Sequence, residues 1–566
     1  MIDKKSFLYS VALNLFFLAL CLFWGNLRFG AIDDYFMSGI LSGIYGDDYN
    51  VHLTFVNAMY GYCLLPFYYL FPKVNWYYIG EMASIFVSLS VICYILIRKI
   101  GYRWGVVVAT LFVALCASDY YLVVQFTQCA AMLSAAGMLA FIYGLEKHEN
   151  HPQSKKWITL LIIGVLLLWW GSWMRWHAFL MGLPFFAYAL LWQTTRIWKT
   201  KWIGLGALLI LFIGAWGFHE FDYSLYRQSD YKKYIDFQGP RSLLGDGLNY
   251  NRQAVDEDLD EMERSGKDYV ILTDWTFYDS YVFAPESIKV VTDVINRYFY
   301  QNSIQSAPVI VLKALQKSVQ RPIFMAWLLL CFSLFYFNPQ KKIWPWISLL
   351  MVTVLIAYLL NLQRFVYRVE SGLWLYAAVL TIPLLKEKMN VSKKFSVGAV
   401  FIIVLANVFL YATEGVYARS PNTGDLVMVQ NEDSDTADYK GLKRYMDSVP
   451  DSTVFIMKMN SYMRLSRKKN PPYLAESKGS WNQIYSFGFW TPYFPEVEKE
   501  LHKRGVTNPI KDVVLDNVFV IDEPLLVDFL ERHYYDKVQV DTIRNFGGMV
   551  VYKYSLDADS LMRAEQ

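Results

Sequence analysis

Two adjacent carboxylates, Asp33 and Asp34, follow the first hydrophobic stretch of the chain by about ten residues. Like charges repel, and the low dielectric near a bilayer disfavours ionisation, so such a pair is costly at the mouth of a membrane domain. The pair is therefore a candidate functional site. A local interpretation stays open beside it, because Asp is a good helix N-cap and residues 35–44 have helical apolar spacing.

Basic side chains follow two other hydrophobic stretches. Arg175 and His177 come directly after the stretch at 157–173, and Arg364 and Arg368 precede the one at 373–385. The fork of a guanidinium group matches phosphate oxygens, so these four residues are predicted to bind a phosphate. The alternative for any single arginine is that it snorkels to lipid headgroups.

Two further acidic residues are predicted to support this cluster. Asp119 lies in a short turn after the stretch at 104–118, and Glu370 follows Arg368 by two residues. Gathered at one mouth with the carboxylate pair, the arginines indicate a site that handles a phosphate rather than scattered lipid contacts.

The composition shows which elements must position these residues. The 566 residues are 55% hydrophobic, 17% aromatic and 18% charged, whereas soluble domains carry about 25% charged residues. The chain is therefore predicted to be a polytopic membrane protein. Its six cysteines lie in or beside hydrophobic stretches and form no disulfide framework or Cys/His metal pattern.

Charge is unevenly distributed. Residues 219–319 carry a formal net charge of −5, residues 414–566 carry −4, and the remainder carries +12. Because cytoplasmic loops are enriched in Lys and Arg, the basic short loops are predicted inside and the two acidic segments outside. The basic loops are 98–103, 146–156, 196–201, 340–342 and 386–394, together with Lys4 and Lys5.

About eleven apolar stretches are long enough to predict membrane spans. They are 6–24, 78–97, 104–118, 126–144, 157–173, 179–192, 202–218, 322–337, 343–360, 373–385 and 395–411. A twelfth stretch, 53–71, would invert every later loop if it crossed. It is therefore predicted to lie in the interface or to re-enter, within a first external loop at 25–77 that Gly61, Pro66 and Pro72 interrupt.

The domain organisation follows from this topology. Residues 1–413 are predicted to form the membrane domain, with a large external loop at 219–319, and residues 414–566 a small external α/β domain. The large loop is expected to be a helical cap with Trp275 packed, and a role of Asp274 and Asp279 in acceptor binding stays open. The C-terminal domain has no Gly-rich phosphate loop and no nucleophile elbow, so no chemistry is assigned to it.

With the acidic pair in IDD (Ile32–Asp34) directly after the first span, the sequence resembles the GT-C class of integral-membrane glycosyltransferases. The resemblance covers residues 6–411 in architecture, in the manner of protein mannosyltransferases and the aminoarabinose transferase, with weaker support from Asp119. No WWD-type motif occurs in the C-terminal domain, which argues against the oligosaccharyltransferase branch. The resemblance implies transfer of a hexose or pentose from a polyprenyl-phosphate donor to a glycan, lipid or protein acceptor on the outer face.

The implied mechanism makes Asp33 or Asp34 the base that deprotonates the acceptor hydroxyl, with inversion at the anomeric carbon. Arg175, His177, Arg364 or Arg368 would stabilise the departing phosphate. The resemblance leaves open whether a divalent metal, Mg²⁺ or Mn²⁺, takes part. It implies a multi-pass protein of the bacterial cell membrane, with the N-terminus cytoplasmic and no nucleic-acid partner.

Two other function classes remain. A polysaccharide polymerase or ligase also uses external arginines and lipid-linked glycans, although it has no need of a first-loop carboxylate pair. A lipid-linked-glycan transporter would need charged residues deep in the spans, where Glu81 is the clearest example and lies near an outer end.

Overall fold

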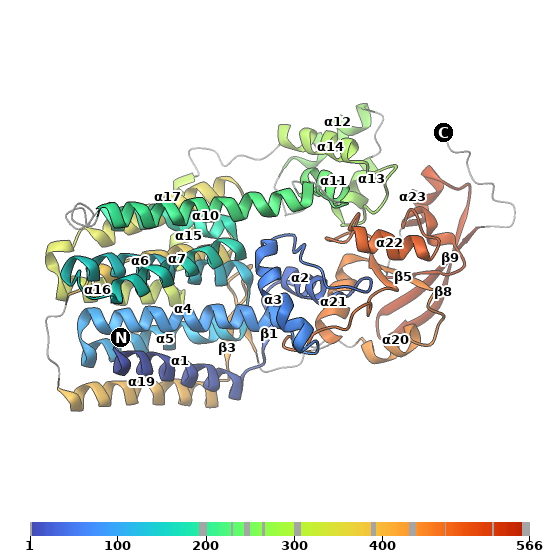
Figure 1. The fold of residues 1–566 in the computed structure, drawn as a ribbon. Coiled ribbons are helices and arrows are strands. Elements are labelled where there is room, and N and C mark those ends of the chain that lie inside the picture. Colours follow the sequence, from blue (N-terminus) through green and yellow to red (C-terminus); the bar gives the residue numbers. More distant parts are fainter. Residues whose placement is uncertain are drawn as a thin grey trace.

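The computed structural model describes residues 3–191, 201–227, 230–242, 250–262, 266–298, 307–386, 392–429, 437–469, 471–522 and 526–556. The molecule is elongated, with a bundle of long helices at one end and a sheet domain at the other (Figure 1). Helices α2 and α3 lie between the two parts, and α11 to α14 lie beside the sheet domain. Acidic, soluble-looking segments therefore sit at one end of the bundle.

Each predicted span coincides with a helix in the described part of the chain. They are α1 (Lys4–Trp24), α4 (Trp76–Ile100), α5 (Tyr102–Tyr121), α6 (Phe126–Asn150), α7 (Lys156–Met174), α8 (Trp176–Leu191), α10 (Lys201–Arg227), α16 (Pro322–Phe337), α17 (Trp344–Asn361), α18 (Tyr367–Val379) and α19 (Lys393–Thr413). Eight described helices are long and apolar enough to span a membrane. The prediction of a polytopic helical bundle with a C-terminal sheet domain is confirmed.

Three of the predicted spans are irregular. Helix α8 is 16 residues long and α18 is 13, whereas a span needs about 20 residues. Helix α15 (Ala307–Ser318) and α16 form a pair bent by 83°. The irregular helices α16 and α18 belong to the same part of the bundle, since α18 packs on both α6 and α16.

Helix α6 forms the centre of the bundle. Its apolar window is fully buried, whereas those of α10 and α19 are 17% and 11% buried and present their side chains outward. The close approach of α6 to α7 depends on glycine, because a Cβ at Gly164 would lie 2.8 Å from the backbone nitrogen of Phe141. Small residues at helix contacts are a common packing device in membranes.

Several predicted basic loops meet at the end of the bundle that carries the N-terminus. Lys99 at the end of α4 pairs with Glu146 on α6 at 2.9 Å, and Arg98 lies 3.6 Å from Asp3. Ser396 on α19 donates to the backbone carbonyl of Arg103 at 2.7 Å. The remaining predicted loops at 196–201 and 386–394 fall largely outside the described residues.

The segment predicted as the first external loop, which is called the first loop below, contains two short helices, α2 (Ile32–Ser42) and α3 (Ala58–Leu70). At 13 residues, α3 is about 20 Å long and too short to cross a hydrocarbon core of about 30 Å. Before α2, strand β1 (Arg28–Phe29) pairs in parallel with β2 (Val123–Val124), which anchors the loop to the bundle between α5 and α6. Residue Ala31 takes the N-cap position of α2 without a side-chain bond, so the interpretation of Asp33 and Asp34 as N-caps is wrong.

The second external segment is helical, as predicted. It contains α11 (Lys232–Ser242), α12 (Arg252–Glu261), α13 (Gly266–Thr273) and α14 (Pro285–Arg297). Helix α14 packs on α11 and α12. The segment is joined to the sheet domain by two hydrogen bonds, in which the backbone nitrogens of Phe277 and Tyr278 donate to the carbonyl of Phe487 at 3.0 and 2.8 Å.

The C-terminal part begins with a hairpin of β3 (Tyr417–Arg419) and β4 (Leu426–Met428), followed by a five-stranded sheet in the order β6-β5-β7-β9-β8. The strands are β5 (Val454–Met457), β6 (Ile484–Ser486), β7 (Val518–Ile521), β8 (Val538–Phe546) and β9 (Met549–Leu556), and the helices are α20 (Tyr439–Met446), α21 (Met459–Lys469), α22 (Pro495–Lys503) and α23 (Leu526–His533). Strands β5, β6 and β7 are parallel and β9 is antiparallel to β7. Strand β5 is entirely buried, which explains its unbroken apolar sequence.

The sheet domain is fastened to the first loop by backbone hydrogen bonds. Gly479 and Trp481 donate to the carbonyls of Gly43 and Ile44 at 2.8 and 3.0 Å, and Ala475 donates to Lys73 at 3.1 Å. The loop that carries the acidic pair is thus held between the bundle and the outer domain.

Candidate active site

The two predicted carboxylates point in different directions. Asp33 and Asp34 occupy the first turn of α2, where successive residues are about 100° apart around the axis. The side chain of Asp34 is fully buried against the bundle, and Asp33 is half-buried at the border with the outer domain. Their position in the first turn is favourable for negative charge because of the helix dipole.

Asp34 is held among side chains of the bundle. Its Oδ1 accepts hydrogen bonds from the hydroxyl of Tyr77 at 3.2 Å and from the backbone nitrogen of Phe126 at 3.3 Å. The carboxyl of Glu81, another fully buried acid, interacts with it from α4. Burial is the main cause that raises the pKa of Asp34 from 3.8 to about 8, and the charge of Asp33 adds to it. Burial therefore favours the protonated form of Asp34, which anchors α2 on the bundle.

Asp33 has a different partner, which comes from the outer domain. The indole nitrogen of Trp490 donates to its Oδ1 at 2.9 Å. Trp490 lies between β6 and α22, in a run of aromatic residues that is buried against α2 and the external helices. The bond joins two residues that are far apart in the sequence and places Asp33 where the bundle, the first loop and the outer domain meet.

Arg175 lies in the same cluster. It is the C-cap residue of α7, where the polypeptide turns into α8. Its guanidinium carbon lies 5.2 Å from the ring centre of Phe55 and 5.4 Å from that of Phe126. The ring of Phe55 in turn packs edge-on against Trp490, with centres 4.5 Å apart. A positive charge is thus set two side chains away from Asp33.

A second arginine meets Trp490 from the large external segment. The guanidinium carbon of Arg241 lies 4.1 Å from the ring centre of Trp490 and 4.7 Å from that of Trp275. Its Nε donates to Oε1 of Gln238 at 2.7 Å, and the side chain is almost fully buried. Stacking of guanidinium on indole rings stabilises the cation, so Arg241 stays charged in an aromatic setting.

The other predicted acids belong to a separate network at the side of the bundle. Oδ2 of Asp119 accepts from the hydroxyl of Tyr367 at 2.9 Å, and its Oδ1 accepts from the backbone nitrogen of Arg419 at 2.9 Å. Oε1 of Glu370 accepts from Ser318 at 2.6 Å, and its Oε2 lies 3.7 Å from Nε of Arg321. This outer network ties the β3–β4 hairpin to α5, α15 and α18.

The remaining predicted phosphate ligands are dispersed. Arg368 lies in the first turn of α18 and donates to the side chain of Asn422, and Arg364 is half-buried in the connection before that helix. His177 is exposed in the first turn of α8, two residues after Arg175. Among the four predicted ligands, the contacts unite Arg175 with the environment of Asp33, and the roles of the others stay predictions.

The start of α6 connects the two networks. Phe126 donates its backbone nitrogen to Asp34, and Gln128 donates through Nε2 to the hydroxyl of Ser371 at 3.4 Å. Ser371 donates to the backbone carbonyl of Arg368 at 3.1 Å. The acidic pair and the arginine-bearing turn before α18 therefore lie on opposite sides of one helix terminus.

Asp274 and Asp279, which flank Trp275, have structural partners. Asp274 pairs with Lys458, and the buried Asp279 accepts from the hydroxyl of Tyr534 at 2.6 Å and from two backbone nitrogens. Trp275 is packed, as predicted for the cap. Both carboxylates fasten the external segment to the sheet domain.

Sequence reasoning missed Arg241 and Trp490 and gave Glu81 no role beside Asp34. Glu81 carried a usable signal, because a single acid in an apolar span is rarely incidental. Trp490 stands in the aromatic run FGFWTPYF, which indicates burial but no partner. Arg241 has no distinguishing pattern around it. In the described part of the chain, no three His, Cys, Asp or Glu side chains gather in a way that could hold a metal ion.

No protein-family model and no curated protein matches the sequence. Two solved structures match, both of ArnT from Cupriavidus metallidurans. The apo structure has a TM-score of 0.43 and 10% identity over 96% of each chain. The structure bound to undecaprenyl phosphate has a TM-score of 0.41 and 10% identity over 98% of this chain and 99% of that one.

Proposed function

We propose that the protein is a membrane glycosyltransferase that moves a sugar from a polyprenyl-phosphate donor to a cell-envelope acceptor at the outer face. The observation that carries the proposal is the placement of Asp33. Its carboxylate is half-buried at the junction of bundle and outer domain, bonded to Trp490, with the guanidinium groups of Arg175 and Arg241 in the same aromatic cluster. A base that shares an aromatic cluster with two cations suits a reaction in which a hydroxyl attacks and a phosphate leaves.

The base in this proposal is Asp33. It accepts the proton of the acceptor hydroxyl while the hydroxyl oxygen forms a bond to the anomeric carbon. The bond from that carbon to the donor phosphate breaks, and its electron pair leaves with the phosphate. One carboxylate acts on the reacting carbon in a single displacement, so the anomeric configuration is inverted.

Asp34 serves this reaction as a positioning residue. Its buried carboxyl accepts hydrogen bonds from Tyr77 and Phe126, which fixes the rotation of α2 around its axis. A neutral Asp34 also removes a like charge from beside Asp33, which leaves the base ionised. In this proposal Asp34 holds α2 in place, and Asp33 acts as the base.

The leaving phosphate would be stabilised by Arg175 and Arg241. Both guanidinium groups are held by aromatic rings, and Nε of Arg241 is also fixed by its hydrogen bond to Gln238. Preorganised cations lower the energy of charge that develops in the transition state. Arg364 and Arg368, on the other side of the α6 terminus, and His177 in the first turn of α8 remain predicted ligands of the same donor.

The membrane setting supports a lipid-linked donor. Outward-facing apolar side chains of α3, among them Tyr69, Leu70 and Phe71, continue the apolar surface of the spans up to the level of the first loop. Aromatic side chains favour the boundary between hydrocarbon and headgroups. An isoprenoid chain could stay in the lipid there while its phosphate reaches the junction.

Two variants test the assignment in the full-length protein. Asp33→Asn and Asp34→Asn are assayed for release or transfer of labelled sugar from a panel of polyprenyl-phosphate hexoses and pentoses. Loss of a general base lowers turnover by roughly 10²- to 10⁴-fold, so Asp33→Asn should be nearly inactive. Asp34→Asn keeps an oxygen acceptor and gains a donor for Glu81, so it should retain at least a third of the turnover. Equal activity of wild type and Asp33→Asn would refute the mechanism.

A further inference from the structure

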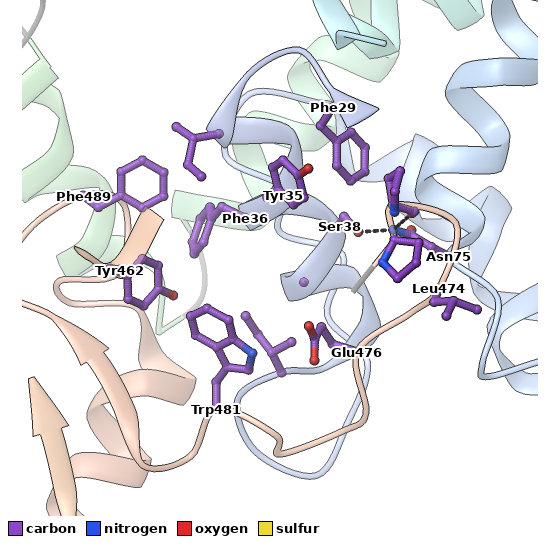
Figure 2. A pocket seen from close by; sticks show the side chains of 15 residues that line it. Phe29, Tyr35, Phe36, Ser38, Asn75, Tyr462, Leu474, Glu476, Trp481 and Phe489 are labelled. Carbon is purple, nitrogen blue, oxygen red and sulfur yellow. Dashed lines mark hydrogen bonds between the residues drawn. The ribbon is translucent and has the colours of Figure 1, made fainter. Parts of the chain in front are cut away.

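A pocket lies on the face of α2 turned away from the bundle (Figure 2). One wall is formed by α2 and the start of α4, with Ile32, Tyr35, Phe36 and Ser38. The opposite wall belongs to the sheet domain and includes Tyr462 on α21, Trp481 and Phe489. The edge is made by the chain at 471–474, which follows α21.

The pocket adjoins Asp33 on both walls. Ile32 lines it and precedes Asp33, and Phe489 lines it and precedes Trp490. Asp33 and Trp490 are themselves joined by the 2.9 Å hydrogen bond, so this bond lies at the rim where the two walls meet. A molecule bound in the pocket would therefore have one side next to the proposed base.

The chemistry of the walls is aromatic with a few oxygen groups. Six rings line the pocket: Phe29, Tyr35, Phe36, Tyr462, Trp481 and Phe489. Figure 2 shows Tyr462 and Trp481 on the sheet-domain wall facing Phe36 on α2, and Glu476 on the same side as Trp481. Ser38 adds a hydroxyl, held by the amide of Asn75 at 2.7 Å. Among the described residues that line the pocket, none is Lys or Arg.

These features exclude the donor phosphate as the occupant. A phosphate brought beside Glu476, with no cation in the described lining, would be repelled and left without partners. The two cations that suit a phosphate, Arg175 and Arg241, lie on the Phe55 and Trp275 side of Trp490 instead. An acyl chain is also disfavoured, because its burial would strip water from the carboxyl of Glu476.

We propose that this pocket binds an uncharged sugar ring of the acceptor, a step that rests on the proposed function. The apolar face of a sugar ring stacks on an aromatic face, and a carboxylate accepts hydrogen bonds from two neighbouring hydroxyls. The half-buried Tyr35 and the largely buried Trp481 supply the aromatic walls, Glu476 the carboxylate and Ser38 a further hydroxyl. The charge of Glu476 selects neutral sugars against uronic acids and phosphorylated sugars.

Direct binding tests the proposal without any need for turnover. Full-length protein in lipid nanodiscs is examined by saturation-transfer NMR with methyl glucoside, methyl galactoside, methyl mannoside, methyl glucuronide and choline as probes. At least one neutral glycoside should bind, and glucuronide and choline should not. Choline tests the rival in which aromatic rings and a carboxylate hold an organic cation. Binding of choline or glucuronide in preference to every neutral glycoside would overturn the proposal.

Two variants connect binding to the pocket. Trp481→Ala should weaken the neutral glycoside at least tenfold. Glu476→Gln keeps the shape of the site, so it should weaken the neutral glycoside only a few-fold while strengthening glucuronide at least tenfold. Tyr281→Ala, which removes an exposed aromatic ring outside the pocket, is the matched control and should bind as wild type does. The Glu476→Gln result stands alone if Trp481→Ala fails to fold, and wild-type binding of both sugars by Glu476→Gln would refute the site.

Failure of the acceptor pocket can be distinguished experimentally from failure of the proposed transferase function. Release of donor sugar to water requires Asp33 and the arginines but no acceptor. Wild-type release that persists in Glu476→Gln, without any sugar bound in the pocket, would leave the transferase standing and remove the acceptor site. If a neutral glycoside binds but no donor releases its sugar, the sugar-binding pocket stands and the transferase proposal is refuted.

Discussion

Burial of Asp34 predicts that the protein loses stability as the pH rises. The pKa of this carboxyl is 3.8 in its ordinary state and about 8 in the folded protein. Between these values the folded state binds a proton that the unfolded state does not, so the contribution is complete below the lower pKa and is lost as the pH rises through the upper one. Each pH unit in that window changes the free energy of unfolding by about 1.4 kcal/mol.

From pH 6 to pH 8 the loss therefore amounts to about 2.3 kcal/mol, because the carboxyl is half ionised where the pH equals its pKa. For a chain of 566 residues, an entropy of unfolding near 2 cal/mol/K per residue converts this to a fall in Tm of about 2 °C. The variant Asp34→Asn removes the titrating group while Tyr77 and Phe126 can still donate to its side-chain oxygen. Its Tm should fall less over the same interval, and the difference between the two slopes isolates the contribution of Asp34.

The measurement is thermal unfolding of the purified full-length protein, followed by tryptophan fluorescence at half-unit steps from pH 5 to pH 9. A second carboxyl outside the spans, Glu496, has its pKa raised by burial and contributes to both slopes, so only their difference is informative. Parallel slopes for wild type and Asp34→Asn would show that Asp34 is ionised in the folded state. That result would also remove the reason for choosing Asp33 over Asp34 as the base.

Three further outcomes follow from the contacts. Trp490→Phe removes one hydrogen bond to the carboxylate of Asp33, which is worth about 1.5 kcal/mol at a half-buried site. The kcat should therefore fall about tenfold, with the KM for the donor unchanged. An unchanged kcat would contradict the role of Trp490 in orienting Asp33. Arg175→Lys and Arg241→Lys lose the stacking on aromatic rings and the planar fork of the guanidinium group, so kcat/KM for the donor should fall roughly 10- to 100-fold. Added guanidine should restore part of the activity of Arg175→Ala. It should restore none of the activity of Asp33→Asn. Gly164→Leu should lower Tm because the new side chain meets the backbone of α6. The control Gly206→Leu should leave Tm unchanged, because open space surrounds Gly206. An equal Tm for the two variants would refute the close packing of α6 on α7.

Hydropathy and charge predict the bundle because both are properties of consecutive residues in the sequence. A span needs only a run of apolar residues, so helices such as α6 and α19 were recognisable without knowledge of their neighbours. The same holds for the outer domain, where the buried strands β5 and β7 are short unbroken apolar runs. Residues 53–71 were excluded as a span because a crossing there would place the later basic loops on the outer side. Helix α3, which occupies most of this stretch, is indeed too short to cross.

The site was only partly predictable, because its partners come from distant segments. Asp33 was recognisable as an acid near a membrane, but no local pattern indicates that Trp490, more than 450 residues later, would donate to it. Arg241 is indistinguishable in sequence from any other loop arginine. The different environments of Asp33 and Asp34 also escaped the sequence, because they depend on which side of α2 meets Tyr77 and Glu81.

The junction at Trp490 is held under backbone strain. Trp275, Phe489 and Tyr493 adopt left-handed conformations with φ of 60°, 64° and 62°, which cost non-glycine residues roughly 1–3 kcal/mol each. All three lie in the two segments that meet beside Asp33, where Phe277 and Tyr278 donate to the carbonyl of Phe487. Such conformations persist only when surrounding contacts fix them. The outer domain is therefore clamped against the first loop, which makes its docking a condition for forming the environment of Asp33.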